Sequence, residues 1–229
     1  ITVLDQRVGD LIGQLKEDGL YEETIIFFYS DHGYGLPRGK RWLKKSGLHV
    51  PLVVRIPEKY KHLRQHEPGS NTDRLVSFLD FAPTTLNLAG VDIPEHMQGQ
   101  PFLGPDSDKE NQWVYASRSR ADDVYDVSRA VLNQNYIYIR NYMPHHSYIP
   151  DALIFSDRKA SLRELRRVRK EGNLNKEAAS WFSPKPVEEL YYTQEDTFEL
   201  NNLAGTNQHQ GRLAKMRGRL RDKILATRD

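Results

Sequence analysis

Residues 24–55 most constrain how this chain can fold, because they read as a strand, a polar turn and a second strand. The first run, TIIFFY at residues 24–29, is rich in β-branched and aromatic side chains, as expected of a strand covered on both faces in an α/β sheet. It stops at SDHG, residues 30–33. Ligands of open α/β sheets bind beyond the carboxyl ends of the strands. Asp31 and His32 are therefore placed like side chains that bind a metal.

The same residues have a simpler interpretation as a turn, in which Asp31 accepts hydrogen bonds from backbone N–H groups and Gly33 supplies a positive φ angle. The following residues favour a site. Residues 37–45 carry five cations in nine positions: Arg38, Lys40, Arg41, Lys44 and Lys45. A solvated basic loop is one interpretation of this run. The other interpretation is a pocket in which a metal ion and these cations bind an anionic substrate.

These residues resemble the central motif of the sulfatases in the alkaline phosphatase superfamily. That motif is a strand ending in Ser-Asp-His/Asn-Gly, then a basic residue, then a second strand. Here it reads YSDHG at residues 29–33, Lys40, and VPLVVR at residues 50–55. The short spacing between SDHG and Lys40 is most similar to the sulfamidase, or heparan N-sulfatase, branch, which has an arginine at this position. Other sulfatases usually place the lysine several residues later, so Lys44 or Lys45 is a reserve candidate.

The resemblance covers nearly the whole chain, as the carboxyl-terminal portion of a sulfatase. Further segments match the family pattern: LDQRVG at residues 4–9, DFAPT at residues 80–84, MQGQPFL at residues 97–103 and VEELYYTQEDTFELNNL at residues 187–203. The resemblance implies an α/β fold, part of an alkaline-phosphatase-like sheet flanked by helices. A smaller α+β subdomain with an antiparallel sheet and a C-terminal helix is expected to follow.

Periodicity along the chain predicts the individual elements. Residues 3–18 predict an amphipathic helix that docks on a sheet and ends at Gly19. Residues 75–79 predict a short strand, and Pro83 suits the first turn of the next helix, with Asp80 as a helix cap rather than a ligand. Later predictions are antiparallel strands at residues 113–117, 128–132 and 136–140, a basic helix at 158–170 and a final helix at 209–226.

The polar stretch GPDSDKEN at residues 104–111 predicts a subdomain boundary. We therefore expect the carboxyl-terminal part of the catalytic α/β domain at residues 1–104 and the α+β subdomain at residues 105–229. The chain starts at Ile1, without a methionine and inside a helical pattern, so it is expected to be cut from a longer polypeptide.

Composition excludes several classes of protein. The 229 residues are 38% hydrophobic and 28% charged, with a net charge of +2, enough for one large or two small globular units. This balance of charge indicates no general nucleic-acid surface. No apolar run approaches the roughly 20 residues that span a bilayer, so no membrane partner is expected. The absence of cysteine excludes disulfides and thiolate metal sites.

The resemblance assigns chemistry to the central motif. Attack at the sulfur of a sulfate ester or sulfamate moves negative charge onto the bridging atom and the other oxygens, and a divalent cation and a lysine stabilise that charge. Asp31 and His32 are the implied metal ligands, and Lys40 is the implied catalytic cation that holds a sulfate oxygen. Ca²⁺ is the expected metal, and the imidazole of His32 leaves Mg²⁺ and Zn²⁺ open.

Two parts of the family's active site have no counterpart in this sequence. The Cys/Ser-x-Pro-x-Arg motif that yields the formylglycine nucleophile is absent, and so are the paired aspartates that complete the metal shell. Formylglycine is expected in an upstream part, and this chain alone is expected to be inactive.

Substrate selectivity in this family is expected from loops of the carboxyl-terminal subdomain. Lys40, His49, Arg129, His145 and His146 are candidates for binding the sulfate and carboxylate groups of a sulfated carbohydrate such as a glycosaminoglycan. A periplasmic, extracellular or lysosomal location is expected from the resemblance. Two alternatives stay open: a phosphatase or phosphodiesterase of the same superfamily, and a non-catalytic carbohydrate-binding protein.

Overall fold

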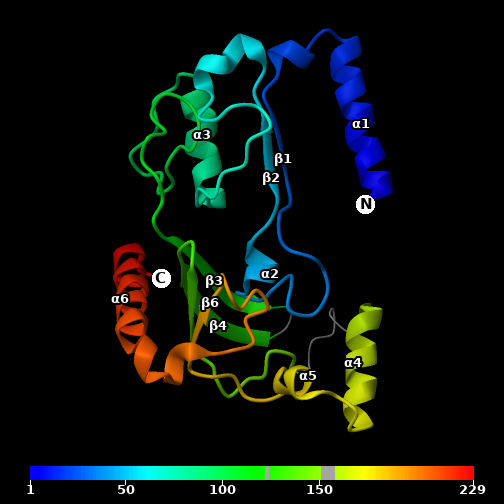
Figure 1. The fold of residues 1–229 in the computed structure, drawn as a ribbon, viewed down its shortest axis with the longest axis vertical. Coiled ribbons are helices and arrows are strands. Elements are labelled where there is room, and N and C mark those ends of the chain that lie inside the picture. The colour runs from blue at the N-terminus through cyan, green and yellow to red at the C-terminus, as the bar shows by residue number, and fades with distance from the viewer. Residues whose placement is uncertain (122–123, 151–157) are drawn as a thin grey trace. The chain divides into compact units, whose positions relative to one another are not determined.

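A computed structural model describes residues 1–121, 124–150 and 158–229, which group into two compact units (Figure 1). Unit 1 comprises Ile1–Ser30 and Pro51–Asn111, and unit 2 comprises Asp31–Val50 and Gln112–Asp229. The loop that carries the central motif therefore belongs to unit 2, although it lies within the first predicted segment. The domain boundary at residues 104–105 stays a prediction.

Unit 1 contains the two strands of the central stretch, β1 (Ile26–Tyr29) and β2 (Leu52–Arg55), which pair antiparallel in a two-stranded sheet. Both strands were predicted. The expected cover on both faces is wrong, because Phe28 and Val53 are exposed, Val53 by 60%. The described residues add no third strand to this sheet.

Helix α1 (Thr2–Glu17) confirms the helix predicted from periodicity. Gly19 ends it with a φ of 70°, a left-handed angle that glycine adopts without a steric penalty. The expected docking on a sheet is wrong, since no residue of α1 is buried and its apolar positions Leu4 and Leu11 are exposed.

The strand expected at residues 75–79 is also wrong, because a capping box folds Phe78–Asp80 into a 3-10 turn. The Ser77 hydroxyl accepts from the Leu79 N–H at 3.3 Å, while the Asp80 carboxylate accepts from the Ser77 N–H at 2.7 Å. Asp80 thus has the capping role that was expected, on this turn and not on the helix α3 (Phe81–Leu88) that follows.

Unit 2 is built on a four-stranded antiparallel sheet in the order β3-β4-β5-β6. Its strands are β3 (Val114–Ala121), β4 (Val124–Leu132), β5 (Tyr136–Asn141) and β6 (Glu188–Tyr192). A tight turn joins β4 and β5, in which the Asn133 side chain accepts from the Asn135 and Tyr136 N–H groups at 3.0 and 2.7 Å.

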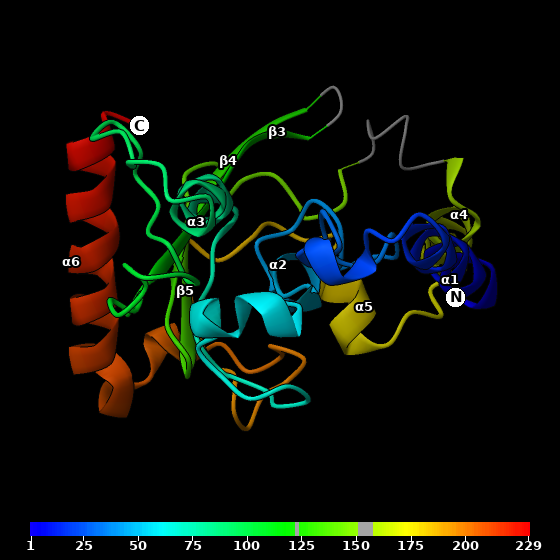
Figure 2. The same ribbon diagram turned by 90° about the horizontal axis from the view of Figure 1, so that it is seen from above.

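The two faces of this sheet bury different partners, as the two-residue period of a strand requires. Helix α6 (Gln210–Thr227) confirms the predicted final helix and packs Leu213, Met216 and Leu220 against one face. Helices α2 (Lys45–Leu48) and α5 (Lys176–Ser180) lie on the other side of the sheet (Figure 2).

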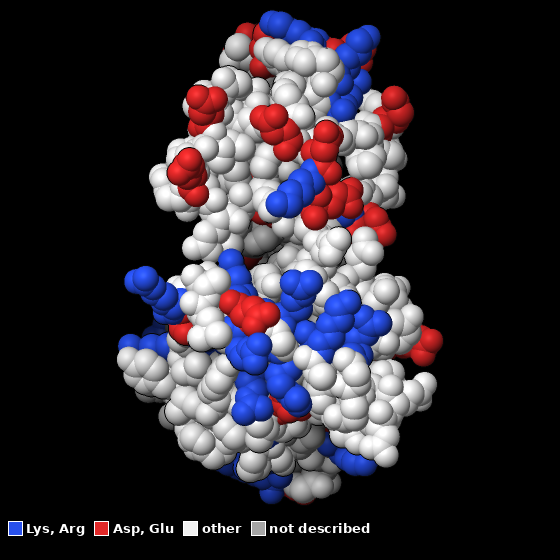
Figure 3. Space-filling model, turned by 90° about the vertical axis from the view of Figure 1, so that its left-hand side faces the viewer, with Lys and Arg blue, Asp and Glu red and all other residues white. Residues whose placement is uncertain are grey.

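The remaining elements are short or charged. Helix α4 (Ala160–Lys170) confirms the predicted basic helix and buries Leu162. The described 3-10 turns are Tyr21–Glu23, Glu58–Leu63, Phe78–Asp80, Leu203–Gly205 and Asn207–His209. Lysine and arginine side chains gather on the side of unit 2 that α6 forms (Figure 3). Across the described ranges, no helix is long and apolar enough to cross a membrane.

Candidate functional site

The loop of residues 31–50 folds tightly on itself because three of its glycines allow close backbone contacts. The Gly33 N–H donates to the Gly47 carbonyl at 3.0 Å, and a Cβ atom on Gly33 would lie 1.9 Å from the Ser46 carbonyl oxygen. A Cβ on Gly39 would lie 2.1 Å from the Tyr34 oxygen. Because a real Cβ never lies so close, only glycine fits these positions. The two ends of the loop are thereby held together.

Residues 42–45 anchor this loop in unit 2. Trp42 is buried against Trp181, with ring centroids 5.5 Å apart, and its Nε1–H donates to the Tyr148 carbonyl at 3.1 Å. Leu43 packs on the sheet face opposite α6. The apolar side chains that fix the loop and two of its cations, Lys44 and Lys45, therefore belong to the same four residues.

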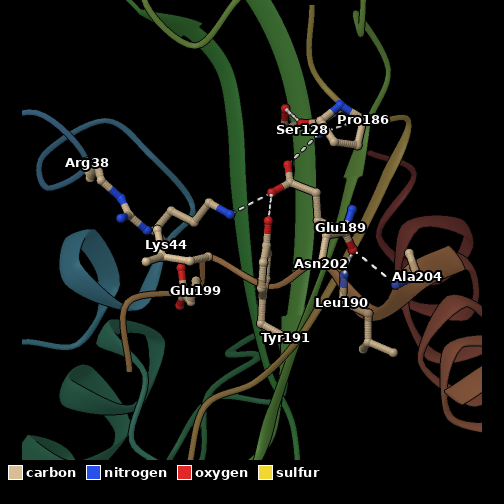
Figure 4. Close-up of polar contacts among 12 residues, drawn as sticks. Arg38, Lys44, Ser128, Pro186, Glu189, Leu190, Tyr191, Glu199, Asn202 and Ala204 are labelled. Carbon is tan, nitrogen blue, oxygen red and sulfur yellow. Dashed lines mark hydrogen bonds and ion pairs between the residues drawn. The ribbon is translucent and has the colours of Figure 1, made fainter. Parts of the chain in front are cut away.

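Lys44, a reserve candidate for the catalytic lysine, is instead a structural cation. Its side chain is 3% exposed, and its ammonium donates to the Glu189 carboxylate at 2.5 Å and lies 3.8 Å from the centroid of the Tyr191 ring (Figure 4). Glu189 also accepts from the Tyr191 hydroxyl at 2.7 Å and the Asn141 side chain at 2.7 Å. A buried charge that is fully paired in this way is not accessible to a substrate.

Asp31 and His32 lie together at the start of the loop. The His32 Nε2 lies 3.2 Å from the Asp31 Oδ2, with side chains 34% and 81% exposed respectively. The His32 Nδ1 lies 2.7 Å from the Gly33 carbonyl oxygen, which can only accept, so we place the proton on Nδ1. In the neutral ring the Nε2 lone pair then faces a carboxylate oxygen. A proton or a metal cation near both atoms stabilises this arrangement, so the pair fits a metal.

Lys40 follows on the same loop, where its N–H donates to the Tyr34 carbonyl at 2.9 Å. Its ammonium is partly exposed and has no hydrogen-bond or ion-pair partner among the residues that the structure describes. An unpaired cation on a folded loop is able to bind an anion. The common pocket expected for Asp31, His32 and Lys40 stays a prediction.

The other predicted substrate-binding residues lie at the end of this loop and elsewhere in unit 2. His49 is exposed at the end of α2. The rings of His145 and His146 contact each other with centroids 4.3 Å apart. Arg129 is largely occupied: its guanidinium pairs with both carboxylate oxygens of Asp229 and donates to backbone carbonyls. The substrate roles of these four residues stay predictions.

In residues 1–121, 124–150 and 158–229, no group of three or more histidine or carboxylate side chains is placed to hold a metal ion. The described cavity of unit 2 lies around the buried ion pair and is lined by residues that include Lys44, Tyr148, Lys185 and Glu189. Apart from the reserve candidate Lys44, none of the predicted site residues lines it.

Sequence reasoning missed two carboxylates that support the loop. Glu189 pairs with Lys44, and the Glu199 Oε1 accepts from the Lys45 N–H at 2.7 Å. Both lie in residues 187–203, the segment that matched the sulfatase signature. The pattern identified the segment, but nothing in it indicated contacts with a loop about 150 residues earlier.

The comparisons with known proteins agree with the motif. Residues 1–91 match the Sulfatase family model. The Ulvan-active sulfatase of Formosa agariphila is 42% identical over 231 residues, covering 100% of this chain and 37% of the relative. This chain belongs to the sulfatase family.

Other sulfatases extend this result. The N-sulphoglucosamine sulphohydrolase of Homo sapiens, from the predicted branch, is 31% identical over 127 residues, covering 51% of this chain and 24% of the relative. The solved structure of a 2-O GAG sulfatase matches with a TM-score of 0.70 at 21% identity, covering 99% of this chain and 41% of the other, which confirms the fold. The chain spans little more than a third of the sulfatases it matches.

Proposed function

We propose that this chain forms the carboxyl-terminal part of a metal-dependent sulfatase that hydrolyses sulfate esters or sulfamates of a carbohydrate such as a glycosaminoglycan. The observation that carries the proposal is a glycine-closed loop presenting the Asp31–His32 pair and the unpaired Lys40. The names of the relatives support the substrate class, since they include an N-acetylglucosamine-6-O-sulfatase. A periplasmic, extracellular or lysosomal location belongs to the same proposal.

In this proposal the residues of the loop stabilise the negative charge of the sulfate group. The Lys40 ammonium binds a sulfate oxygen and opposes the negative charge that develops as the bond to sulfur breaks. Asp31 and His32 would hold a divalent cation, Ca²⁺ in our proposal, which supplies further positive charge to the sulfate oxygens when bound. The Gly33 carbonyl orients the His32 ring by accepting from Nδ1.

The exposed apolar surface of unit 1 supports a larger whole. Leu4 and Leu11 of α1, Phe28 of β1 and Val53 of β2 are all exposed. Large apolar side chains exposed on a helix and on both strands are typical of a surface that a partner covers. We propose that the rest of the sulfatase fold covers it and supplies the formylglycine nucleophile and the other metal ligands, so that this chain alone is inactive.

Replacement of Lys40 tests the catalytic assignment in the full-length protein. Lys40→Ala should lower kcat on a small aryl sulfate by about 10²–10³-fold and change KM less, because the lost donor acts mainly in the transition state. Lys45→Ala, which removes another partly exposed cation of the same loop, is the matched control and should leave kcat within about twofold.

Two results would contradict the proposal. An unchanged kcat in the Lys40→Ala enzyme would remove Lys40 from catalysis. A wild-type enzyme that hydrolyses the matched aryl phosphate and leaves the aryl sulfate intact would favour the phosphatase alternative. No turnover of either ester, with retained binding of a sulfated oligosaccharide, would favour the carbohydrate-binding protein.

A further inference from the structure

The segment around Glu199 closes on the loop that carries Lys40. The Glu199 side chain is buried, with 4% exposed, and its Oε1 accepts from the Lys45 N–H at 2.7 Å. One residue earlier, the Phe198 carbonyl accepts from the Arg38 guanidinium. Arg38 and Lys45, near the two ends of the basic run, therefore contact neighbouring residues of one distant segment. Figure 4 labels Arg38, Lys44 and Glu199 on these two segments.

This junction also holds strained backbone. Among the described residues, the non-glycine positions with positive φ are Arg38, Arg41, Glu199 and the penultimate residue, Arg228. The first three, with φ of 70°, 88° and 51°, lie in the two segments that meet here. Each such residue has an energetically unfavourable backbone conformation and persists only where its surroundings enforce it. The contacts between the segments are thus strong enough to hold unfavourable conformations.

The turn that carries Glu199 is itself rigidly held. The Glu199 N–H donates to the Asp196 carbonyl at 3.0 Å. The Asp196 carboxylate accepts from the Leu200 and Asn201 N–H groups at 3.0 and 2.8 Å. Glu199 is therefore presented to Lys45 from a turn whose backbone is fixed on both sides.

A continuous set of contacts joins Lys45 to the backbone beside Lys40. The Ser46 hydroxyl donates to the Arg38 carbonyl at 2.6 Å. The next residue, Gly47, lies so close to Gly39 that a Cβ atom there would be 2.4 Å from the Gly39 oxygen. Fixing the Lys45 amide therefore fixes residues 45–47, and these fix residues 38–39, immediately before Lys40.

We propose that Glu199 is a positioning residue for the sulfatase reaction: its carboxylate holds the Lys45 amide and thereby sets the position of Lys40. This inference rests on the proposed function. It separates two roles in the loop, because Lys40 contacts the substrate while Glu199 acts only through the backbone. A displacement of about 1 Å in a catalytic group costs up to about 10²-fold in rate, so even a small relaxation of the loop is measurable.

Kinetics of the full-length protein on an aryl sulfate test this inference. Glu199→Ala removes the acceptor and should lower kcat by about 10–100-fold. Glu199→Gln keeps an oxygen acceptor of the same length and should retain kcat within about threefold, since a neutral acceptor still satisfies the amide. A glutamine variant as impaired as the alanine variant would overturn the proposal.

A double-mutant cycle with Lys40 distinguishes positioning from a general structural role. If Glu199 acts through Lys40, then Glu199→Ala should have little further effect on kcat in a Lys40→Ala background. Asp80→Ala is the matched control, since this buried carboxylate caps backbone amides of unit 1 and has, among the described residues, no hydrogen bond or ion pair with residues 38–46. Its effect should be on stability and equal in both backgrounds. Full additivity of Glu199→Ala and Lys40→Ala would overturn the proposal.

Hydrogen exchange of the same proteins gives a readout that needs no activity. Glu199→Ala should raise amide exchange in residues 38–46 by at least about tenfold while β4 and β5 stay protected, and Glu199→Gln should not. Unchanged exchange in the alanine variant would overturn the inference. A different result would separate the two proposals. If exchange increases in Glu199→Ala but Lys40→Ala keeps full kcat, Glu199 positions the loop and the proposed function fails.

Discussion

At the scale of single residues, Lys44 and Glu189 combine two charges inside unit 2. Burial by itself raises the pKa of Glu189, but the Lys44 ammonium and hydrogen bonds outweigh it, so the net pKa is lowered and the carboxylate is ionised at neutral pH. Taking two charges out of water costs several kcal/mol per ion, and the attraction between the two ions does little more than offset that cost. The pair thus depends on both members being present.

Removal of one member should therefore destabilise unit 2. We expect Lys44→Met to lower the free energy of unfolding by about 3–5 kcal/mol, because Glu189 stays buried without its cation. The double variant Lys44→Met/Glu189→Leu should recover most of the loss. Tryptophan fluorescence in a urea titration measures this for unit 2 alone, since all three tryptophans, residues 42, 113 and 181, belong to it. A double variant as unstable as the single one would contradict the argument.

Glu199 should make stability depend on pH. Burial raises its pKa above the usual 4.5, with smaller opposing effects from Lys44 and the Lys45 N–H. A folded-state pKa above the unfolded one means that the folded protein binds more protons, so the free energy of unfolding falls as pH rises from about 4.5 through the folded pKa. Glu199→Gln should lack this fall. Urea titrations at several pH values compare the two proteins, and parallel curves would exclude the effect.

At the scale of elements, the site loop depends on glycines that helix α6 does not need. Gly33→Ala places a Cβ 1.9 Å from the Ser46 oxygen and should open the loop, lowering kcat of the full-length enzyme by at least about tenfold. Gly218→Ala in α6 is the matched control, because nothing lies within 4 Å and alanine favours a helix by about 1 kcal/mol. Aryl sulfate kinetics of both variants decide the matter. Equal losses would show that crowding at Gly33 is not the cause.

The elements that the sequence predicted are those with local signals. Helix α1, the strands of unit 2 and the apolar stripe of α6 follow from periodicity within a few neighbouring residues. The strand at residues 75–79 was mispredicted because the capping box between Ser77 and Asp80 overrides β propensity.

The candidate site was predictable only in part, for a physical reason. The SDHG motif and Lys40 lie within one short stretch, so their residue types and spacing indicate chemistry directly. The supporting contact between Lys45 and Glu199 joins residues 154 positions apart, and no periodicity encodes it. The burial of Lys44 was likewise missed, because a lysine is almost never fully buried unless it is paired.

At the scale of the whole molecule, the exposed apolar residues of α1 and β1–β2 distinguish this chain from the proposed complete enzyme. In the 229-residue chain, α1 has no buried residue and should exchange its amide hydrogens quickly. In the full-length protein, a partner surface should protect the same amides by at least about tenfold. The strand β5, buried in both, is the internal control. Equal exchange of α1 in both proteins would contradict the proposal that the rest of the fold covers it.

The assignment of residues 31–50 to unit 2 has a consequence for how the protein is made. Lys44 leaves the ribosome 145 residues before Glu189, and Lys45 leaves it 154 residues before Glu199. At about 5–20 residues per second, the loop waits roughly 7–30 seconds for the carboxylates that hold it. During that interval Trp42 and Leu43 are nascent apolar side chains without their core. The loop is therefore synthesised well before the segments that hold it, and chaperones have an opportunity to bind there.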